Sequence, residues 1–404
     1  MQNEDLTCSF PTETIKEGKV EAVVPKLEAF AKLPSDYAPS KAPVFYNPVM
    51  ELNRDLAVLA LQAYQRTVDH EIVVCEPLTG CGLRGIRFAA EVEGAKGVIM
   101  NDISEKAYCL AKFNVESNDL SRKATVRHEE ANLLLSRFSA PHRRFDAVDI
   151  DPFGSPVRFL DSALRALWDG GFIAMTATDM APLCGVHPRA CIRKYGGKPL
   201  RTEYCHELAV RLLAGCLVTT AAKHDIGLDV AFSHRAEHYV RMCAIIKYGA
   251  KKADESIKNM GYLSHCFTCF HREKKNMFAV QRSDVCSECG SKLNRAGPLW
   301  LGRLFDPRFV ELMENEANHR KLGCQRKINN MLAVIKTETE APITYYVVDK
   351  LCDSLNFPVP PVKRVIEALT REGFQASPTH FSSRGIRSNA PASKLKEILY
   401  DLVN

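Results

Sequence analysis

The first 250 residues alternate short apolar runs with segments of helical periodicity. The apolar runs predict strands at residues 71–77, 96–102, 124–131, 145–151 and 171–179. Helical spacing occupies the intervals, for which we expect helices at 83–94, 104–118 and 155–170. Repeated strand–helix–strand units of this kind predict an α/β fold with a mostly parallel, doubly wound, Rossmann-like sheet.

The pattern changes after a long predicted helix near residues 202–224. Two strand-like runs follow in 228–249 with no helix between them, so we expect an antiparallel hairpin at the end of the sheet. Residues 341–388 predict a helix, a break, a second helix and a short wing, as in a winged helix. In that wing, Arg384 and Arg387 either meet phosphate or lie on a solvated surface.

Composition and charge divide the chain in two. Its 404 residues, 46% of them hydrophobic, suffice for two or three domains. Residues 251–404 hold 24 Lys and Arg against 17 Asp and Glu, whereas residues 1–250 are nearly neutral. We therefore predict a catalytic domain at 1–250 and a basic α+β domain at 251–404. The basic surface either is simply solvated or holds a polyanion.

Several protein classes are disfavoured. The first residues resemble neither a secretory signal nor a transit peptide, and no run of about 18 uncharged apolar residues follows. Most of the 15 cysteines lack a regular spacing and are interpreted as reduced core thiols. We expect a cytoplasmic protein without membrane contact. The sequence does not define the oligomeric state, although a monomer is plausible.

A glycine turn follows the first predicted strand. Gly80, Gly82 and Gly85 have the G-x-G-x-x-G spacing of nucleotide-binding turns, although glycines also end strands and permit close helix packing. Glu76 lies at the strand end, four residues before Gly80. A carboxylate there would repel a pyrophosphate, but it would attract an ammonium group.

The next two strand ends complete the prediction of the ligand. Asp102 can accept hydrogen bonds from two ribose hydroxyls, and the Glu130–Ala131 pair can meet an adenine edge. Ammonium, ribose and adenine without phosphate describe S-adenosylmethionine, which we therefore predict as the cofactor.

The fourth strand ends in DIDPFGSP at residues 149–156. Asp151 and a nearby carbonyl can accept hydrogen bonds from an exocyclic amine and direct its lone pair toward a methyl group, while Phe153 stacks on the base. A strand-ending turn with a buried Phe is the plain alternative. Beside the acidic glycine turn, the catalytic interpretation is favoured.

Five stretches together resemble the tRNA (guanine-26-N2)-dimethyltransferases: FYNPVMELNRD, GLRGIR, DPFGSP, TATDMAPLCG and CIRKYGGKP. GPLWLG extends the likeness toward the C-terminus. The resemblance implies catalysis around Asp151, with Phe45 and Phe153 on either side of a flipped guanine. It also implies S-adenosylmethionine contacts, at Arg54, Arg84, Asp102, Glu130 and Ala131.

A second signal lies in the C-terminal half. Cys266 and Cys269 form one C-x-x-C pair, Cys286 and Cys289 another, and sixteen residues separate the pairs. This spacing predicts a structural Zn²⁺ site, with four free thiols as the alternative. His265 and His271 flank the first pair and could replace a thiolate, although we expect exposed neutral histidines.

The metal would hold a loop carrying Arg272, Lys274, Lys275 and Arg282. We interpret the chain as an enzyme that methylates N2 of guanosine 26 in tRNA, and we expect N2,N2-dimethylguanosine as its product. One alternative is an amine methyltransferase acting on DNA or protein. The other is a non-catalytic RNA-binding protein, which would have no use for Glu76, Asp102 and Asp151 together.

Overall fold

The computed structural model describes residues 9–31, 39–279 and 284–403. Contacts divide the chain into two compact units. The first comprises Met1–Pro152, Phe159–Met175 and Glu311–Asn330. The second comprises Phe153–Arg158, Thr176–Val310 and Met331–Asn404. These two units are defined by the contacts within each of them. The predicted boundary at residue 250 separates a catalytic domain from a tRNA-binding domain, and it stays a prediction. Arg282, predicted in the basic loop, lies outside the described residues.

The first unit contains the parallel strands. They are β3 (Ile72–Glu76), β4 (Ala95–Asn101), β5 (Ala124–Arg127), β6 (Phe145–Ile150) and β7 (Leu167–Ala177). The sheet has the strand order β5-β4-β3-β6-β7-β9-β8. It is mixed, because the neighbours from β5 to β7 pair in parallel whereas β9 and β8 pair antiparallel. Every residue of β6 is buried, which explains its nearly continuous apolar run. The predicted strands are confirmed, and β5 ends earlier than expected.

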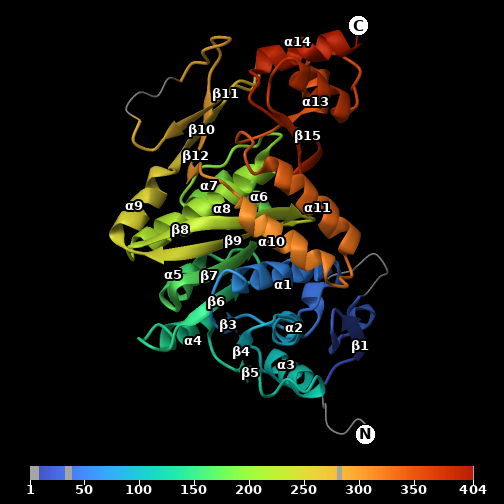
Figure 1. Ribbon diagram of the computed structural model, residues 1–404, viewed down its shortest axis with the longest axis vertical. Helices are drawn as coiled ribbons and strands as arrows, with labels where there is room; N and C mark the ends of the chain where they lie inside the picture. Colours follow the sequence, from blue (N-terminus) through green and yellow to red (C-terminus); the bar gives the residue numbers. More distant parts are fainter. Residues whose placement is uncertain (1–8, 32–38, 280–283, 404) are drawn as a thin grey trace. The chain divides into compact units, whose positions relative to one another are not determined.

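Helices alternate with these strands along the chain, and the first of them precedes β3. They are α1 (Glu51–Gln65), α2 (Leu83–Glu91), α3 (Glu105–Ser117), α4 (Ala131–Arg137) and α5 (Val157–Arg165). Helix α2 packs against β4 and α3 against β5 (Figure 1). The prediction of a helix as far as residue 170 was wrong. Phe145 N donates to Ala166 O at 2.8 Å and Phe145 pairs with Leu167, so the segment after α5 joins the sheet.

The N-terminal part of this unit was not predicted. Strands β1 (Thr12–Glu17) and β2 (Val20–Pro25) form an antiparallel hairpin, and β2 packs against α2 and α3. Three short 3-10 helices follow, η1 (Leu27–Phe30), η2 (Pro39–Lys41) and η3 (Pro48–Met50). Glu17, the last residue of β1, is buried and pairs with Arg54 and Arg87. The hairpin therefore helps to position these two arginines.

The second unit begins with short helices and a long one. These are α6 (Met180–Leu183), α7 (Pro188–Tyr195) and α8 (Cys205–Ala222). Helix α8 is long and apolar enough to cross a membrane, but 72% of it is buried in the protein, as in the core helices of soluble proteins. The predicted antiparallel hairpin is confirmed by β8 (Ile226–Ala236) and β9 (Tyr239–Tyr248), which pair from Ile226↔Tyr248 to Ala236↔Tyr239.

Two smaller sheets complete the second unit. Helix α9 (Ala250–Lys258) leads to β10 (Met260–His265), which pairs antiparallel with β11 (Arg272–Asn276) and β12 (Asn294–Trp300). The other sheet has the order β13-β15-β14. Its strands are β13 (Tyr346–Val347), β14 (Ala376–Thr379) and β15 (Ser382–Ser388).

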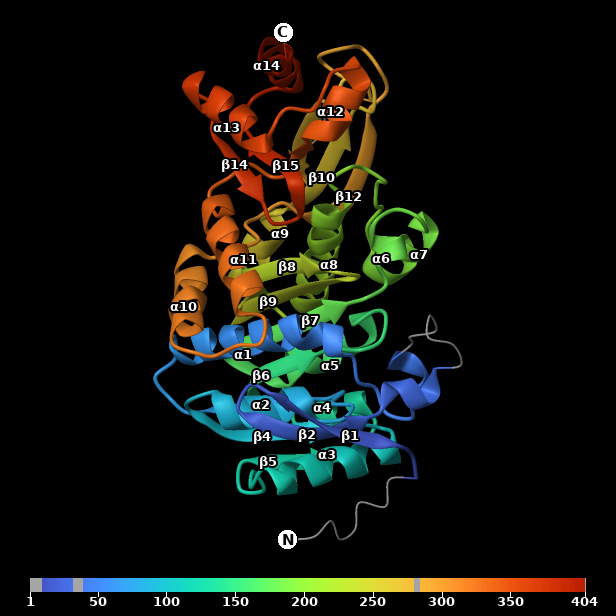
Figure 2. The ribbon, with the colours of Figure 1, turned by 90° about the vertical axis from the view of Figure 1, so that its right-hand side faces the viewer.

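Helices pack against the β13-β15-β14 sheet and against one another (Figure 2). They are α12 (Val348–Leu355), α13 (Val362–Arg371) and α14 (Ala392–Val403). The predicted order of helix, break, helix and wing is present, with Asn356 in the left-handed conformation ending α12. Helices α10 (Pro307–Asn318) and α11 (Gln325–Glu338) precede it, and neither was predicted.

Candidate functional site

The glycine turn after β3 needs its glycines for two different reasons. Gly80 and Gly82 have φ angles of +57° and +83°, a region that side chains rarely tolerate. At Gly85 a Cβ would lie 2.6 Å from Met100 and 2.7 Å from the Glu76 carboxylate. Because Gly85 has no side chain, α2 can approach the ends of β3 and β4 closely.

Arg84, at the start of α2, is the centre of a buried polar cluster. Its Nη1 lies 3.2 Å from both carboxylate oxygens of Asp149, and its Nη2 donates to Asn53 Oδ1 at 2.9 Å. Nη2 also contacts Asp151, and Nε lies 3.6 Å from Glu76. The cluster thus brings three carboxylates from the ends of β3 and β6 around one guanidinium.

These carboxylates differ in burial. Glu76 is 2% exposed, and burial raises its pKa to about 8 despite the nearby Arg84 and a hydrogen bond from Thr79. The Asp151 side chain is 19% exposed, so its carboxylate is the most accessible of the three. With this pKa, Glu76 is largely protonated at neutral pH when no ligand is bound. It is suited to pair with a cationic group that a ligand brings to it.

Asp102 lies just after β4 and is held in place by the backbone. Its Oδ2 accepts a hydrogen bond from Gly80 N at 2.9 Å, and its Oδ1 accepts one from Ser104 N at 2.9 Å. Each carboxylate oxygen still has a further lone pair. The geometry fits two ribose hydroxyls beside the glycine turn.

The third strand end leads directly into a helix cap. Glu130 caps α4, because its Oε2 accepts a hydrogen bond from Leu133 N at 2.9 Å. Ala131 is the buried first residue of that helix. Glu129 pairs with Arg137 at 2.6 Å, and its backbone bonds with the Asn101 side chain. The helix cap keeps the Glu130–Ala131 segment beside β5.

Arg54 is placed in another buried network. Its Nε and Nη2 contact the two carboxylate oxygens of Glu17 at 2.7 and 2.5 Å, and its Nη1 donates to Asn47 O at 3.1 Å. Glu17 also pairs with Arg87, whose other partners are the buried Asp55 and Glu91. The structure therefore brings Arg54 together with the β1–β2 hairpin.

The two predicted aromatic residues belong to different units, and the structure does not place them relative to one another. Phe45 precedes η3, and its backbone carbonyl lies against Gly80. Phe153 is 66% exposed. The turn that carries it is fixed by Thr178, since Gly154 N donates to Thr178 Oγ1 at 2.8 Å and Thr178 N donates to Gly154 O at 2.9 Å.

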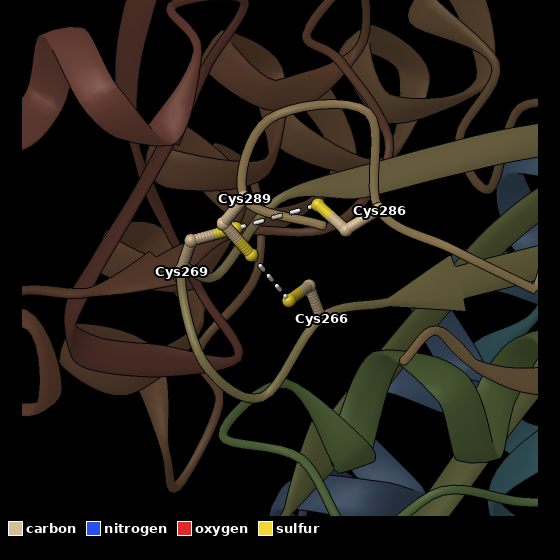
Figure 3. A group of neighbouring side chains, drawn as sticks. All are labelled: Cys266, Cys269, Cys286 and Cys289. Carbon is tan, nitrogen blue, oxygen red and sulfur yellow. Dashed lines mark hydrogen bonds between the residues drawn. The ribbon is translucent and has the colours of Figure 1, made fainter. Parts of the chain in front are cut away.

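The four predicted cysteine ligands lie together in the second unit (Figure 3). Cys266 Sγ is 3.4 Å from Cys289 Sγ, and Cys269 Sγ is 3.5 Å from Cys286 Sγ. All four sulfur atoms lie within 4.8 Å of one another, which suits a tetrahedral metal site. The donor set fits a thiophilic ion.

The neighbouring histidines were predicted incorrectly as exposed. His265 is fully buried against Tyr204 and Phe267, because it ends β10 inside the unit. His271 is half-buried and contacts Glu288 and Glu273 at 2.9 and 3.3 Å. Neither ring belongs to the group of four sulfur atoms.

The wing arginines also differ from the prediction. Arg387 is 2% exposed and pairs with Glu338 at 2.5 Å and Glu207 at 3.0 Å, so it faces neither phosphate nor solvent. The last four residues of β15, 385–388, are all buried. Arg384 is partly exposed and pairs with Asp349 at 2.7 Å. Arg387 is buried, and not on the surface as predicted, because two buried carboxylates that are distant in the sequence pair with it.

The sequence analysis missed two members of the Arg84 cluster. Asp149 lies two residues before Asp151, so strand alternation was an available signal for both side chains on one face. Asn53 precedes Arg54 in the NRD stretch, but it is brought to Arg84 only by the packing of α1 against α2. Asn53 Nδ2 is buried without a hydrogen-bond partner in the described structure.

A parallel sheet with a glycine turn after β3 and acidic side chains at the following strand ends defines a Rossmann-like methyltransferase. Residues 18–400 match the family described as N2,N2-dimethylguanosine tRNA methyltransferase. The chain belongs to this family.

Individual relatives agree over nearly their whole length. A tRNA (guanine(26)-N(2))-dimethyltransferase of Methanobrevibacter smithii is 42% identical over 394 residues, 97% of this chain and 98% of its own. The corresponding protein of Pyrococcus abyssi is 38% identical over 399 residues, 95% and 98% of the two chains. The structure of Trm1 from Pyrococcus horikoshii with S-adenosyl-L-methionine has a TM-score of 0.84 and 36% identity, and the match covers 96% of this chain and 99% of that one.

Proposed function

We propose that this chain transfers methyl groups from S-adenosylmethionine to N2 of guanosine 26 in tRNA, giving N2,N2-dimethylguanosine. Its family and the names of its relatives support this reaction. The observation that carries it is the convergence of Glu76, Asp149 and Asp151 on Arg84. Asp151 is the most exposed of these three acids, and it lies beside the buried Arg84 guanidinium.

The cofactor would be held by the strand ends of the first unit. Glu76 would pair with the ammonium group, and Asp102 would accept the ribose hydroxyls. Arg54 and Arg84 would hold the carboxylate end, and the Glu130–Ala131 segment would border the adenine. Bound S-adenosylmethionine supplies an electrophilic methyl group on its sulfonium.

The substrate guanine would be oriented by three side chains. Asp151 accepts a hydrogen bond from the N2 amine, so the lone pair of that amine is directed toward the methyl group. Once the nitrogen has bonded to carbon it is acidic, and Asp151 is placed to take its proton. Phe45 and Phe153 would stack on the flipped base.

The C-terminal part would bind the tRNA. We propose that Cys266, Cys269, Cys286 and Cys289 hold a structural Zn²⁺, supported by their close sulfur atoms. We also propose that α12, α13 and the β14–β15 hairpin act as a winged helix within a basic domain spanning residues 251–404. We also propose a cytoplasmic location without membrane contact, which cell fractionation tests. A monomeric state is proposed as well, and light scattering tests it.

The reaction is tested with the full chain and an unmodified tRNA transcript. After incubation with S-adenosylmethionine, nucleoside mass spectrometry is expected to find N2,N2-dimethylguanosine, and a transcript with adenosine at position 26 should stay unmodified. Methylation at another base, or none with the intact transcript, would contradict the proposal. S-adenosylmethionine should also raise the melting temperature, whereas NAD should not.

A further inference from the structure

A second group of metal-binding side chains lies outside both sites described above. It consists of Cys184, Cys205 and His206, whose ligand atoms lie within 4.8 Å of one another. Cys184 is the C-cap of α6, and Cys205 and His206 are the first two residues of α8. All three side chains are half-buried, so they are sheltered and still reachable by an ion.

The backbone is shaped to bring these residues together. Gly185 has φ of +88°, and a Cβ there would lie 2.8 Å from Arg201 N and 2.9 Å from Leu200 C. The chain after Cys184 can therefore touch the chain before α8 only because residue 185 is glycine. The Cys184 thiol in turn donates to Cys205 O at 3.8 Å.

We propose that Cys184, Cys205 and His206 form a second Zn²⁺ site with an open fourth position. Two thiolates and one imidazole are ligands that a borderline-soft ion such as Zn²⁺ prefers. In a tetrahedral zinc site the ligand atoms lie ~3.3–3.8 Å apart, given Zn–S and Zn–N bonds of about 2.3 and 2.0 Å. The observed ligand atoms, which lie within 4.8 Å of one another, need to move closer by at most ~1.3 Å to reach that geometry.

The site closes a basic segment between its ligands. Residues 185–204 include α7 and carry one acid, Glu203, which is half-buried and contacts Arg272. Five exposed cations share the segment, namely Arg189, Arg193, Lys194, Lys198 and Arg201. Zinc at its two ends would restrict this segment and present its cations to a polyanion. This role in tRNA binding rests on the proposed function, whereas the metal site itself does not.

The metal content of the full chain tests the site. Elemental analysis of the wild-type protein should give about two zinc ions per chain, one for each cysteine group. Cys184→Ser and His206→Gln should each lower this to about one, while Cys109→Ser, at an exposed cysteine outside both groups, should retain both. About one zinc per chain in the wild type would overturn the proposal, as would a Cys184–Cys205 disulfide found by peptide mapping.

Cobalt substitution of the wild type gives a readout that does not depend on the folding of a variant. Two cobalt ions should bind, and their spectrum should contain a two-thiolate component beside the four-thiolate one. A purely four-thiolate spectrum at saturation would overturn the site. For the role of the segment, His206→Gln should weaken tRNA binding severalfold at low salt and less at high salt. Unchanged tRNA affinity after loss of the second zinc would overturn that role, and failure of the wild type to methylate tRNA would instead count against the proposed function.

Discussion

The Arg84 cluster and the four-cysteine group are both compact polar sites, but they are built in different ways. The cysteines come from two short C-x-x-C turns between residues 266 and 289. The Arg84 cluster takes side chains from α1, β3, α2 and the end of β6, between residues 53 and 151. One site depends on local spacing and a metal, and the other on the order of strands in a sheet. We therefore expect that removing one residue of either site disrupts that site and leaves the other intact.

The largest expected effect separates the two sites by chemistry. Asp151→Ala should lower the methylation rate roughly 10²- to 10⁴-fold, because it removes the acceptor for the reacting amine. Cofactor affinity by calorimetry and zinc content should stay near wild type. Asp161→Ala, which alters an exposed acid paired with Arg165, is the control. Near-normal turnover of the Asp151 variant would leave Asp151 as a turn residue only.

Phe153 tests how far the reaction centre extends along the chain. Phe153→Ala should reduce kcat/KM ~5- to 150-fold, the loss expected for one base-stacking contact of about 1–3 kcal/mol. Phe153→Tyr keeps an aromatic face and should retain most activity. Since Phe153 is 66% exposed, thermal melting should be nearly unchanged in both variants. Equal activity of the Ala and Tyr variants would argue against stacking.

Disrupting the cysteine group should give the opposite pattern. Cys266→Ser should release about one zinc per chain and weaken tRNA binding about tenfold, since a structural metal stabilises the loops that it closes. S-adenosylmethionine binding should be retained, because its proposed contacts lie in the first unit. Elemental analysis, calorimetry and tRNA titration across a salt series measure these three properties. Loss of cofactor binding with intact tRNA affinity would reverse the assignment.

The effect expected on stability alone concerns the proton on Glu76. Burial raises the Glu76 pKa from 4.5 to about 8, so the native state holds a proton that the unfolded state loses. The resulting stability is fully present below pH 4.5 and is lost as pH rises toward 8. The slope should be at most about 1.4 kcal/mol per pH unit in this window.

Denaturant titrations of the cofactor-free chain across the same window measure that slope. Glu76→Gln, which cannot ionise, should remove the contribution. Binding of S-adenosylmethionine to the wild type should also release protons, because an ammonium group favours the Glu76 carboxylate. An unchanged pH slope in the Gln variant would show that another group is responsible.

Much of the fold follows from local pattern. The strand and helix periods predicted β3 to β9 together with α2, α3, α5 and α8, but they did not predict the short helices α4, α6 and α7. Strand β6 is entirely buried, as a parallel central strand should be. The glycine spacing marked a turn whose positive φ angles favour glycine at residues 80 and 82. The C-x-x-C spacing identified all four members of the cysteine group. These features depend on residues that lie close together in the sequence, so they can be predicted from the sequence alone.

Tertiary structure decided the partners of the charged residues. The arginine in the wing, Arg387, is buried by Glu207 and Glu338, and no local pattern distinguishes it from a solvated cation. Arg54 pairs with Glu17 because an unpredicted N-terminal hairpin carries that acid to it. Asn53 and Asp149 meet Arg84 in the same way, through the packing of distant elements. A sequence therefore specifies which groups need partners, since burying an unpaired charge is costly, but only the packed fold determines which partner each one receives.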